Sequence, residues 1–197
     1  MWARTMTLLN GVRLGPYAIQ ALAGAGGMGE VYRAIDTRLD RTVAIKVLPA
    51  PVADRPTRRQ RLERETRAIS RMNHPHICTL YDVGEYDGLP FLVMEWVEGE
   101  TLADRLLRGA LPIDQVLRCA IEIADALEHA HRQGIVHRDL KPSNVMLAPS
   151  GVKLLDFGVA QLWAPDEMSS PFIGTRPADT LTDEGTMIGT VQYMAPE

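Results

Sequence analysis

The chain has 197 residues, 46% of them hydrophobic, which suffices for a core in one domain or two small lobes. Its formal net charge of -4 gives no general affinity for nucleic acid, and its two cysteines fit a reducing compartment better than a disulfide framework. No stretch approaches the ~20 apolar residues that a membrane helix needs, so we expect a cytoplasmic chain without a membrane segment.

Residues 17–34 are predicted to form two strands around a glycine-rich turn, G-A-G-G-M-G at 24–29. A dinucleotide-binding turn of this form needs a helix directly after its last glycine, whereas a β-branched and an aromatic residue follow here. The pattern therefore favours a hairpin that covers phosphates, with close backbone approach allowed by Gly24, Gly26 and Gly29.

The next predicted strand, residues 42–48, is apolar apart from the ammonium of Lys46. A buried charge is costly unless it is paired, so this lysine either reaches solvent at an edge or needs a carboxylate partner. Residues 58–72 are predicted to form a charged helix, which could supply that carboxylate.

The clearest helix covers residues 111–133, with Pro112 in its first turn and Gly134 after its end. Apolar residues recur every three or four positions and are expected to form a stripe toward the core: Val116, Ala120, Ile123 and Leu127. Near the end of the helix, His129 and His131 are expected to be surface residues favoured by the helix dipole rather than metal ligands.

Four side chains suited to chemistry fall within 18 residues: Asp139, Lys141, Asn144 and Asp156. Pro142 prevents a helix, so residues 138–144 are expected to form a loop. On that loop, Asp139 could accept a proton from an incoming hydroxyl group.

A hairpin is predicted after this loop, because two short apolar runs, 145–147 and 152–155, flank the turn residues 149–151. A hairpin brings its two ends together, so Asn144 and Asp156 should lie side by side. Paired oxygen ligands suit Mg2+, which usually also takes oxygens from a substrate phosphate.

The segment H-R-D-L-K-P-S-N at 137–144, followed twelve residues after Asn144 by D-F-G, resembles the eukaryotic-type protein kinases. G-x-G-x-x-G-x-V, ending at Val31, and V-A-I-K, ending at Lys46, match the same signature set. The ending G-T-x-x-Y-M-A-P-E at 189–197 also resembles the family, and the bacterial members are the most similar.

The resemblance covers essentially residues 16–197 in the right order. It implies an α+β, bilobal protein-kinase-like fold: an N-terminal extension at 1–16, a β-rich N-lobe at 17–98, and a partial α-helical C-lobe at 99–197. The later helices of the C-lobe would be missing, so we expect a truncated chain with little activity of its own. The helix at 111–133 would then keep part of its apolar stripe in water.

The resemblance also implies four catalytic residues: Asp139, Lys141, Lys46 and Glu65. Asp139 would orient and deprotonate a substrate hydroxyl, and Lys141 would neutralise the γ-phosphate of ATP. Lys46, fixed by Glu65, would place the α- and β-phosphates. Asn144 and Asp156 would hold Mg2+. Glu65 is chosen because it lies nine residues before His74, the usual offset in the family.

The implied ATP-binding residues are Gly24, Gly26, Gly29, Val31, Ala44, Lys46, Met94, Glu95, Val97 and Met146. Residues 77–83 and 89–97 would be the next two strands. Met94 would guard the back of the pocket, and the backbone of residues 95–97 would hydrogen-bond adenine. Residues 99–102 would start a short helix into the second lobe.

A long loop is predicted at 161–189 from its prolines, glycines and serines, and the resemblance implies that it is an activation loop. Thr182 and Thr186 are the expected phosphorylation sites. Thr190 would belong to the substrate loop and would hydrogen-bond Asp139 and Lys141.

The implied activity is serine/threonine protein kinase, with ATP and Mg2+ as cofactors and a protein Ser or Thr as substrate. A second kinase copy could be a partner in a dimer for trans-autophosphorylation, and the full-length parent could be membrane-anchored. Three alternatives stay open: an inactive kinase fragment, an ATP-binding pseudokinase module, and a small-molecule phosphotransferase of related fold.

Overall fold

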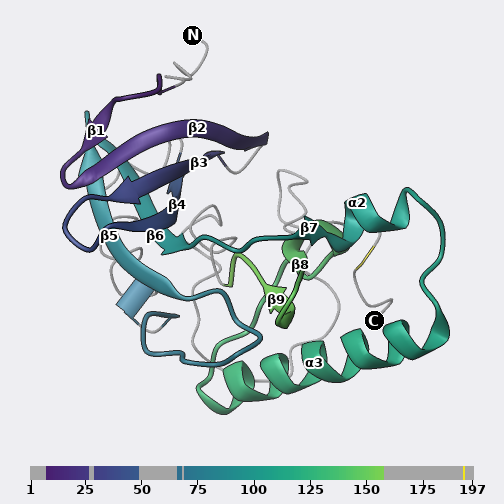
Figure 1. The fold of residues 1–197 in the computed structure, drawn as a ribbon. Helices are drawn as coiled ribbons and strands as arrows, with labels where there is room; N and C mark the ends of the chain where they lie inside the picture. The colour runs from purple at the N-terminus through teal and green to yellow at the C-terminus, as the bar shows by residue number, and fades with distance from the viewer. Residues whose placement is uncertain (1–7, 27–28, 49–65, 68, 158–192, 194–197) are drawn as a thin grey trace, which may run out of the picture.

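The computed structural model describes residues 8–26, 29–48, 66–67, 69–157 and 193. In these residues six strands form one sheet and three short strands form a second sheet, with one long helix below it (Figure 1). Some predicted features fall outside the described residues: Glu65, most of the helix at 58–72, the loop at 161–189, and Thr182, Thr186 and Thr190.

The larger sheet is antiparallel throughout, in the order β1-β2-β3-β4-β6-β5. Its strands are β1 Arg13–Leu14, β2 Tyr17–Gly26, β3 Gly29–Asp36, β4 Arg41–Val47, β5 Leu80–Tyr86 and β6 Leu89–Glu95. The smaller sheet has β7 Glu100–Thr101, β8 Val145–Ala148 and β9 Gly151–Leu154. The helical elements are α2 Leu102–Leu106, α3 Ile113–Arg132 and the 3-10 turn η2 Pro142–Asn144.

The predicted glycine hairpin is present, because β2 and β3 pair antiparallel up to Gly26 and Gly29. A strand, and not a helix, follows Gly29, which is the feature that separates this turn from a dinucleotide-binding turn.

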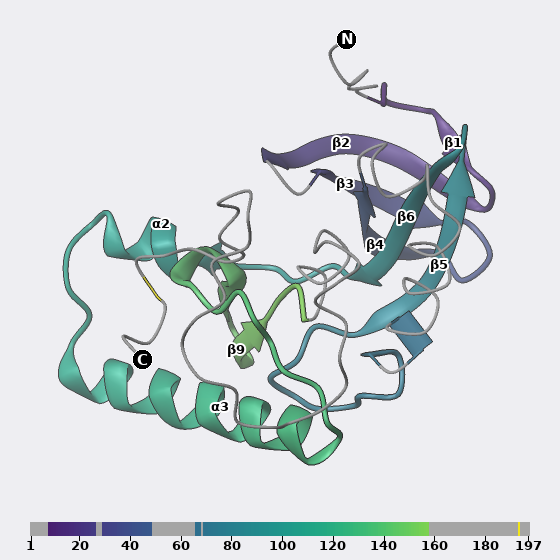
Figure 2. The same cartoon turned by 180° about the vertical axis from the view of Figure 1, so that it is seen from behind.

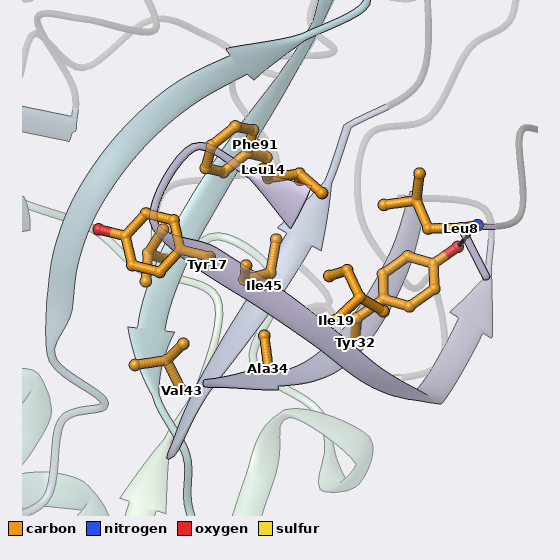
Figure 3. Packing of buried hydrophobic residues seen from close by; sticks show 10 residues of the cluster. Leu8, Leu14, Tyr17, Ile19, Tyr32, Ala34, Val43, Ile45 and Phe91 are labelled. Atoms are coloured by element: carbon orange, nitrogen blue, oxygen red, sulfur yellow. Dashed lines mark hydrogen bonds between the residues drawn. The ribbon is translucent and has the colours of Figure 1, made fainter. Parts of the chain in front are cut away.

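One face of the larger sheet carries a hydrophobic core. Alternate residues point to that face, so Val43 and Ile45 of β4 pack against Tyr32 and Ala34 of β3 (Figure 3). The buried members of the cluster are Leu8, Leu14, Tyr17, Ile19, Tyr32, Ala34, Val43, Ile45, Phe91 and Val93. The intervening residues of β4, Ala44 and Lys46, therefore belong to the opposite face.

The strand predicted at 77–83 begins three residues later, at Leu80. The reason is that residues 76–78 give their backbone hydrogen bonds to β9: Cys78 N donates to Leu154 O at 2.9 Å, and Leu154 N donates to His76 O at 2.8 Å. This segment thereby connects the two sheets.

The short helix predicted from residues 99–102 begins at Leu102 instead. Thr101 caps it, with its Oγ1 accepting from Asp104 N at 3.0 Å. Gly99 has a φ of 141°, outside the helical range, and a Cβ there would overlap the carbonyl oxygen of Leu147 on β8.

Helix α3 packs against the β8–β9 hairpin, and part of its apolar stripe is exposed, as expected from the kinase resemblance. Ala126 and Ala130 are fully buried, with Ile123 and Leu127 partly buried beside them. Predicted core residues Val116 and Ala120 are exposed, because the N-terminal turns of α3 extend beyond the hairpin (Figures 1 and 2). Other exposed apolar side chains of these turns are Ile113, Leu117 and Ile121.

Candidate active site

The face of the larger sheet opposite the core carries four of the residues predicted to bind ATP. Val31 pairs with Lys46, and Ala44 pairs with Met94. Directly paired residues of antiparallel strands point to the same side, and Ala44 and Lys46 are two residues apart on β4. The sheet therefore presents Val31, Ala44, Lys46 and Met94 on one surface.

Lys46 meets a carboxylate, as its buried position requires. Its Nζ lies 2.7 Å from Asp156 Oδ2, and only 3% of the residue is exposed. The ion pair joins β4 to the end of the β8–β9 hairpin, so the larger sheet and the smaller sheet meet here. Asp156 has a φ of 58°, in the left-handed region that is unfavourable for most side chains.

The predicted hairpin is confirmed and brings its two ends together. Val145 pairs with Leu154, and just beyond that pair Leu155 N donates to Asn144 O at 2.9 Å. Asp156 follows Leu155 directly, so Asn144 and Asp156 leave the hairpin from adjacent positions.

In the loop before the hairpin, Asp139 is held by contacts with neighbouring residues of the same loop. Asp139 is 4% exposed, and its Oδ2 lies 2.8 Å from Lys141 Nζ. Asn144 Nδ2 donates to the same oxygen at 3.0 Å and to the Asp139 backbone carbonyl at 2.8 Å. Three of the predicted site residues are thus brought together around one carboxylate.

His137 supports this site, although the sequence reasoning gave it no role. Its Nε2 contacts Leu155 O at 2.9 Å, its Nδ1 lies 3.4 Å from Asp139 N, and its ring lies 4.6 Å from that of Phe157. Burial lowers the pKa of His137 below its ordinary value, so the ring stays neutral near pH 7. The H-R-D and D-F-G segments are therefore held together through this imidazole.

Glu95, predicted to begin the adenine-binding segment, ends β6 and has a lysine partner that sequence reasoning missed. Lys153 Nζ lies 2.8 Å from each of its carboxylate oxygens. Met146 pairs with Lys153 across the hairpin and so shares the side on which Glu95 lies. No local sequence signal could have found Lys153, because it is 58 residues from Glu95.

Comparison with known proteins matches this geometry to a family. The family described as "Protein kinase domain" matches residues 17–197. The chain belongs to the protein kinase domain family. A probable serine/threonine-protein kinase of Streptomyces coelicolor is 43% identical over 190 residues, covering 93% of this chain and 26% of that protein. Serine/threonine-protein kinase PknH of Mycobacterium tuberculosis is 39% identical over 189 residues, covering 95% and 28%.

Solved structures agree with the fold. The PknI kinase domain of Mycobacterium tuberculosis matches with a TM-score of 0.70 and 34% identity, covering 78% of this chain and 64% of that one. The predicted kinase family and kinase-like fold are therefore confirmed. The chain spans about a quarter of the length of the curated kinases named above. Among the helices that the structure describes, none is long and apolar enough to cross a membrane.

Proposed function

We propose that the protein is a serine/threonine kinase that transfers the γ-phosphate of ATP to a hydroxyl group of a protein. The observation that carries the proposal is the buried Asp139, held by Lys141 and Asn144 one hairpin away from the Lys46–Asp156 ion pair. A carboxylate for the hydroxyl and a lysine for the phosphates are the groups that phosphoryl transfer needs.

The residues present fit Mg2+. The amide nitrogen of Asn144 is occupied by Asp139, which leaves its amide oxygen, with the carboxylate of Asp156, as hard oxygen donors at the hairpin end. No cluster of three His, Cys, Asp or Glu side chains suited to a metal occurs within the described residues, and Mg2+ characteristically completes its shell with phosphate oxygens and water. Bound there, Mg2+ would neutralise charge on the phosphates.

The chain's own residues would divide the remaining work. Lys46 would place the α- and β-phosphates below the glycine hairpin, and Asp139 would orient the substrate hydroxyl and accept its proton. Lys141, already 2.8 Å from Asp139, would offset negative charge on the γ-phosphate. In this proposal Met94, Ala44 and Val31 line the adenine side, with the backbone of residues 95–97 as its hydrogen-bonding edge.

Other parts of the proposal follow from the family. We place the N-lobe at 17–98 and the part of the C-lobe present at 99–197, and we keep Glu65 as a second carboxylate for Lys46. Thr182 and Thr186 remain the proposed phosphorylation sites, and Thr190 the proposed contact of the substrate loop. A protein substrate and a second kinase copy are the proposed partners.

The test is Asp139→Asn in a protein that contains the complete kinase domain, measured as transfer of labelled phosphate from ATP to a generic protein substrate. Transfer should fall about 10²- to 10⁴-fold, the usual contribution of a general base, while ATP affinity stays within about twofold. Asp114→Asn, at the exposed start of α3, is the matched control and should behave as the parent.

Three results would contradict the proposal. Transfer by Asp139→Asn at the parent's rate would remove the role of this carboxylate. ATP binding without any transfer by the unmutated complete kinase domain would favour a pseudokinase module. Preferential phosphorylation of an aminoglycoside over protein would favour a small-molecule phosphotransferase.

A further inference from the structure

The segment 153–156 is attached to the larger sheet by two ion pairs of opposite polarity. In one, Lys46 of β4 contacts Asp156 at 2.7 Å. In the other, Glu95 at the end of β6 contacts Lys153 at 2.8 Å. Strands β4 and β6 are neighbours in the sheet. The sheet thus supplies one cation and one anion, and the segment supplies their counterparts three residues apart.

The Glu95–Lys153 pair is largely shielded from water. The two side chains are 24% and 13% exposed, and both carboxylate oxygens lie 2.8 Å from the ammonium. Glu95 Oε2 also accepts from Thr79 N at 3.2 Å, while Glu95 N donates to Thr79 O at 2.9 Å. An exposed ion pair contributes little, but removing one partner of a shielded pair leaves an uncompensated charge.

The position of the pair relates it to the nucleotide. Glu95 begins the segment proposed to bind adenine through its backbone, and Lys153 lies three residues before Asp156, a proposed metal ligand. Asp156 is proposed to contact both Lys46 and Mg2+. When Mg·ATP is bound, its carboxylate would therefore divide its interactions between the lysine of the sheet and the cation. The side chains of Glu95 and Lys153 have no contact with Mg·ATP in that proposal, because Glu95 would bind adenine through its backbone, so their ion pair stays in place when the nucleotide is bound.

We propose that Lys153 is a positioning residue for Mg·ATP: through Glu95 it fixes the distance between the adenine-binding backbone and Asp156. This inference rests on the proposed function and extends it to a residue outside the kinase signature motifs. Folding does not depend on the pair alone, because Cys78 N and His76 O hold β9 to the 76–78 segment through backbone hydrogen bonds with Leu154. Variants at Lys153 should therefore fold.

The experiment measures ATP affinity by calorimetry with and without Mg2+ for Lys153→Met, Glu95→Gln and the double variant. Each single variant should bind Mg·ATP about tenfold more weakly, and the double variant no more weakly than either, as expected for contacting residues. The gain in affinity that Mg2+ gives should also shrink, since Asp156 is displaced. Lys153→Arg should keep most of the Mg·ATP affinity and most of the gain in affinity from Mg2+. Arg132→Met, which removes an exposed ion pair within α3, is the control and should bind as the parent.

The outcomes separate this inference from the proposed function. A parent protein that does not bind Mg·ATP would overturn the proposed function, and this inference with it. A parent that binds, with Lys153→Met and Glu95→Gln binding equally well, would overturn only the inference. Losses that add in the double variant would show that the two residues act independently, and losses that are equal with and without Mg2+ would show a purely structural pair. Either result would overturn the inference as well. A lower melting temperature of the Lys153 and Glu95 variants at unchanged affinity for Mg·ATP would also overturn the inference.

Discussion

The loop at 138–144 and the Lys46–Asp156 pair hold their charged groups by different means. Asp139, Lys141 and Asn144 lie within six residues and contact one another, so the loop's own geometry places them. Lys46 and Asp156 are 110 residues apart and come from different sheets. The first group is therefore organised locally, whereas the second exists only when the two sheets are correctly placed.

Among the variants that test this comparison besides Asp139→Asn, the largest effect is expected from the long-range pair. Lys46→Met should weaken phosphate placement and reduce phosphoryl transfer by about 100-fold or more, as removal of a preorganised charge typically does. Unlike Asp139→Asn, it should also weaken ATP binding, because this lysine is proposed to contact the nucleotide and not the hydroxyl. Calorimetry and transfer assays together check this, with the exposed Arg118→Met as control. Unchanged ATP affinity in Lys46→Met would erase the distinction between the two regions.

A smaller effect is expected from a change in Asn144, one of the locally organised loop residues. Asn144→Ala removes two hydrogen bonds to Asp139 and leaves buried acceptors with fewer donors. The free energy of unfolding should fall by about 1–3 kcal/mol, measured by urea denaturation. Ser143→Ala, at the exposed neighbouring position, is the control and should change stability little. Equal stability of Asn144→Ala and Ser143→Ala would mean that the loop is held by other contacts.

The smallest effect concerns His137, which links the two regions. Its folded-state pKa is lowered by burial below the unfolded value of about 6.5. As pH falls through that value, the unfolded chain takes up a proton first, so stability is present at neutral pH and declines toward acid. The contribution is at most about 1.4 kcal/mol per pH unit. Melting temperatures between pH 5 and 8 should fall less steeply toward acid for His137→Asn than for the parent.

The exposed, non-titrating Gln115→Asn is the control for that measurement and should keep the parent's slope. Some slope should remain in His137→Asn, because burial also lowers the pKa of His74. An identical slope in His137→Asn and the parent would show that the imidazole is not held neutral by the fold.

Features with local determinants were predictable from the sequence. The glycine hairpin and the β8–β9 hairpin depend on residues a few positions apart, and the structure has both. The loop predicted at 138–144 is correct only up to residue 141, because Pro142–Asn144 form a 3-10 turn, in whose first position proline is tolerated. The adjacency of Asn144 and Asp156 followed from the hairpin alone. The family signature motifs then related these pieces to Lys46, which no spacing argument could have paired with Asp156.

The errors and omissions have a common cause in contacts distant along the chain. Residues 77–79 have strand-like composition, but His76 and Cys78 make backbone hydrogen bonds with Leu154 of β9, and β5 begins only at Leu80. The stripe of α3 has helical periodicity throughout, yet only the part beneath the hairpin is buried, which left Val116 exposed. Lys153 and His137 have partners 58 and 18 residues away, so nothing in their own neighbourhood marked them.

Gly99 limits how the sequence can vary where the chain crosses from the larger sheet to the smaller one. The backbone at this position lies so near the Leu147 carbonyl that a single methyl group would overlap it, and its φ of 141° is itself unfavourable for any side chain. Alanine at position 99 would therefore force the crossing and β8 apart. A swap of the proposed adenine-binding segment between kinases would have to keep this glycine in register.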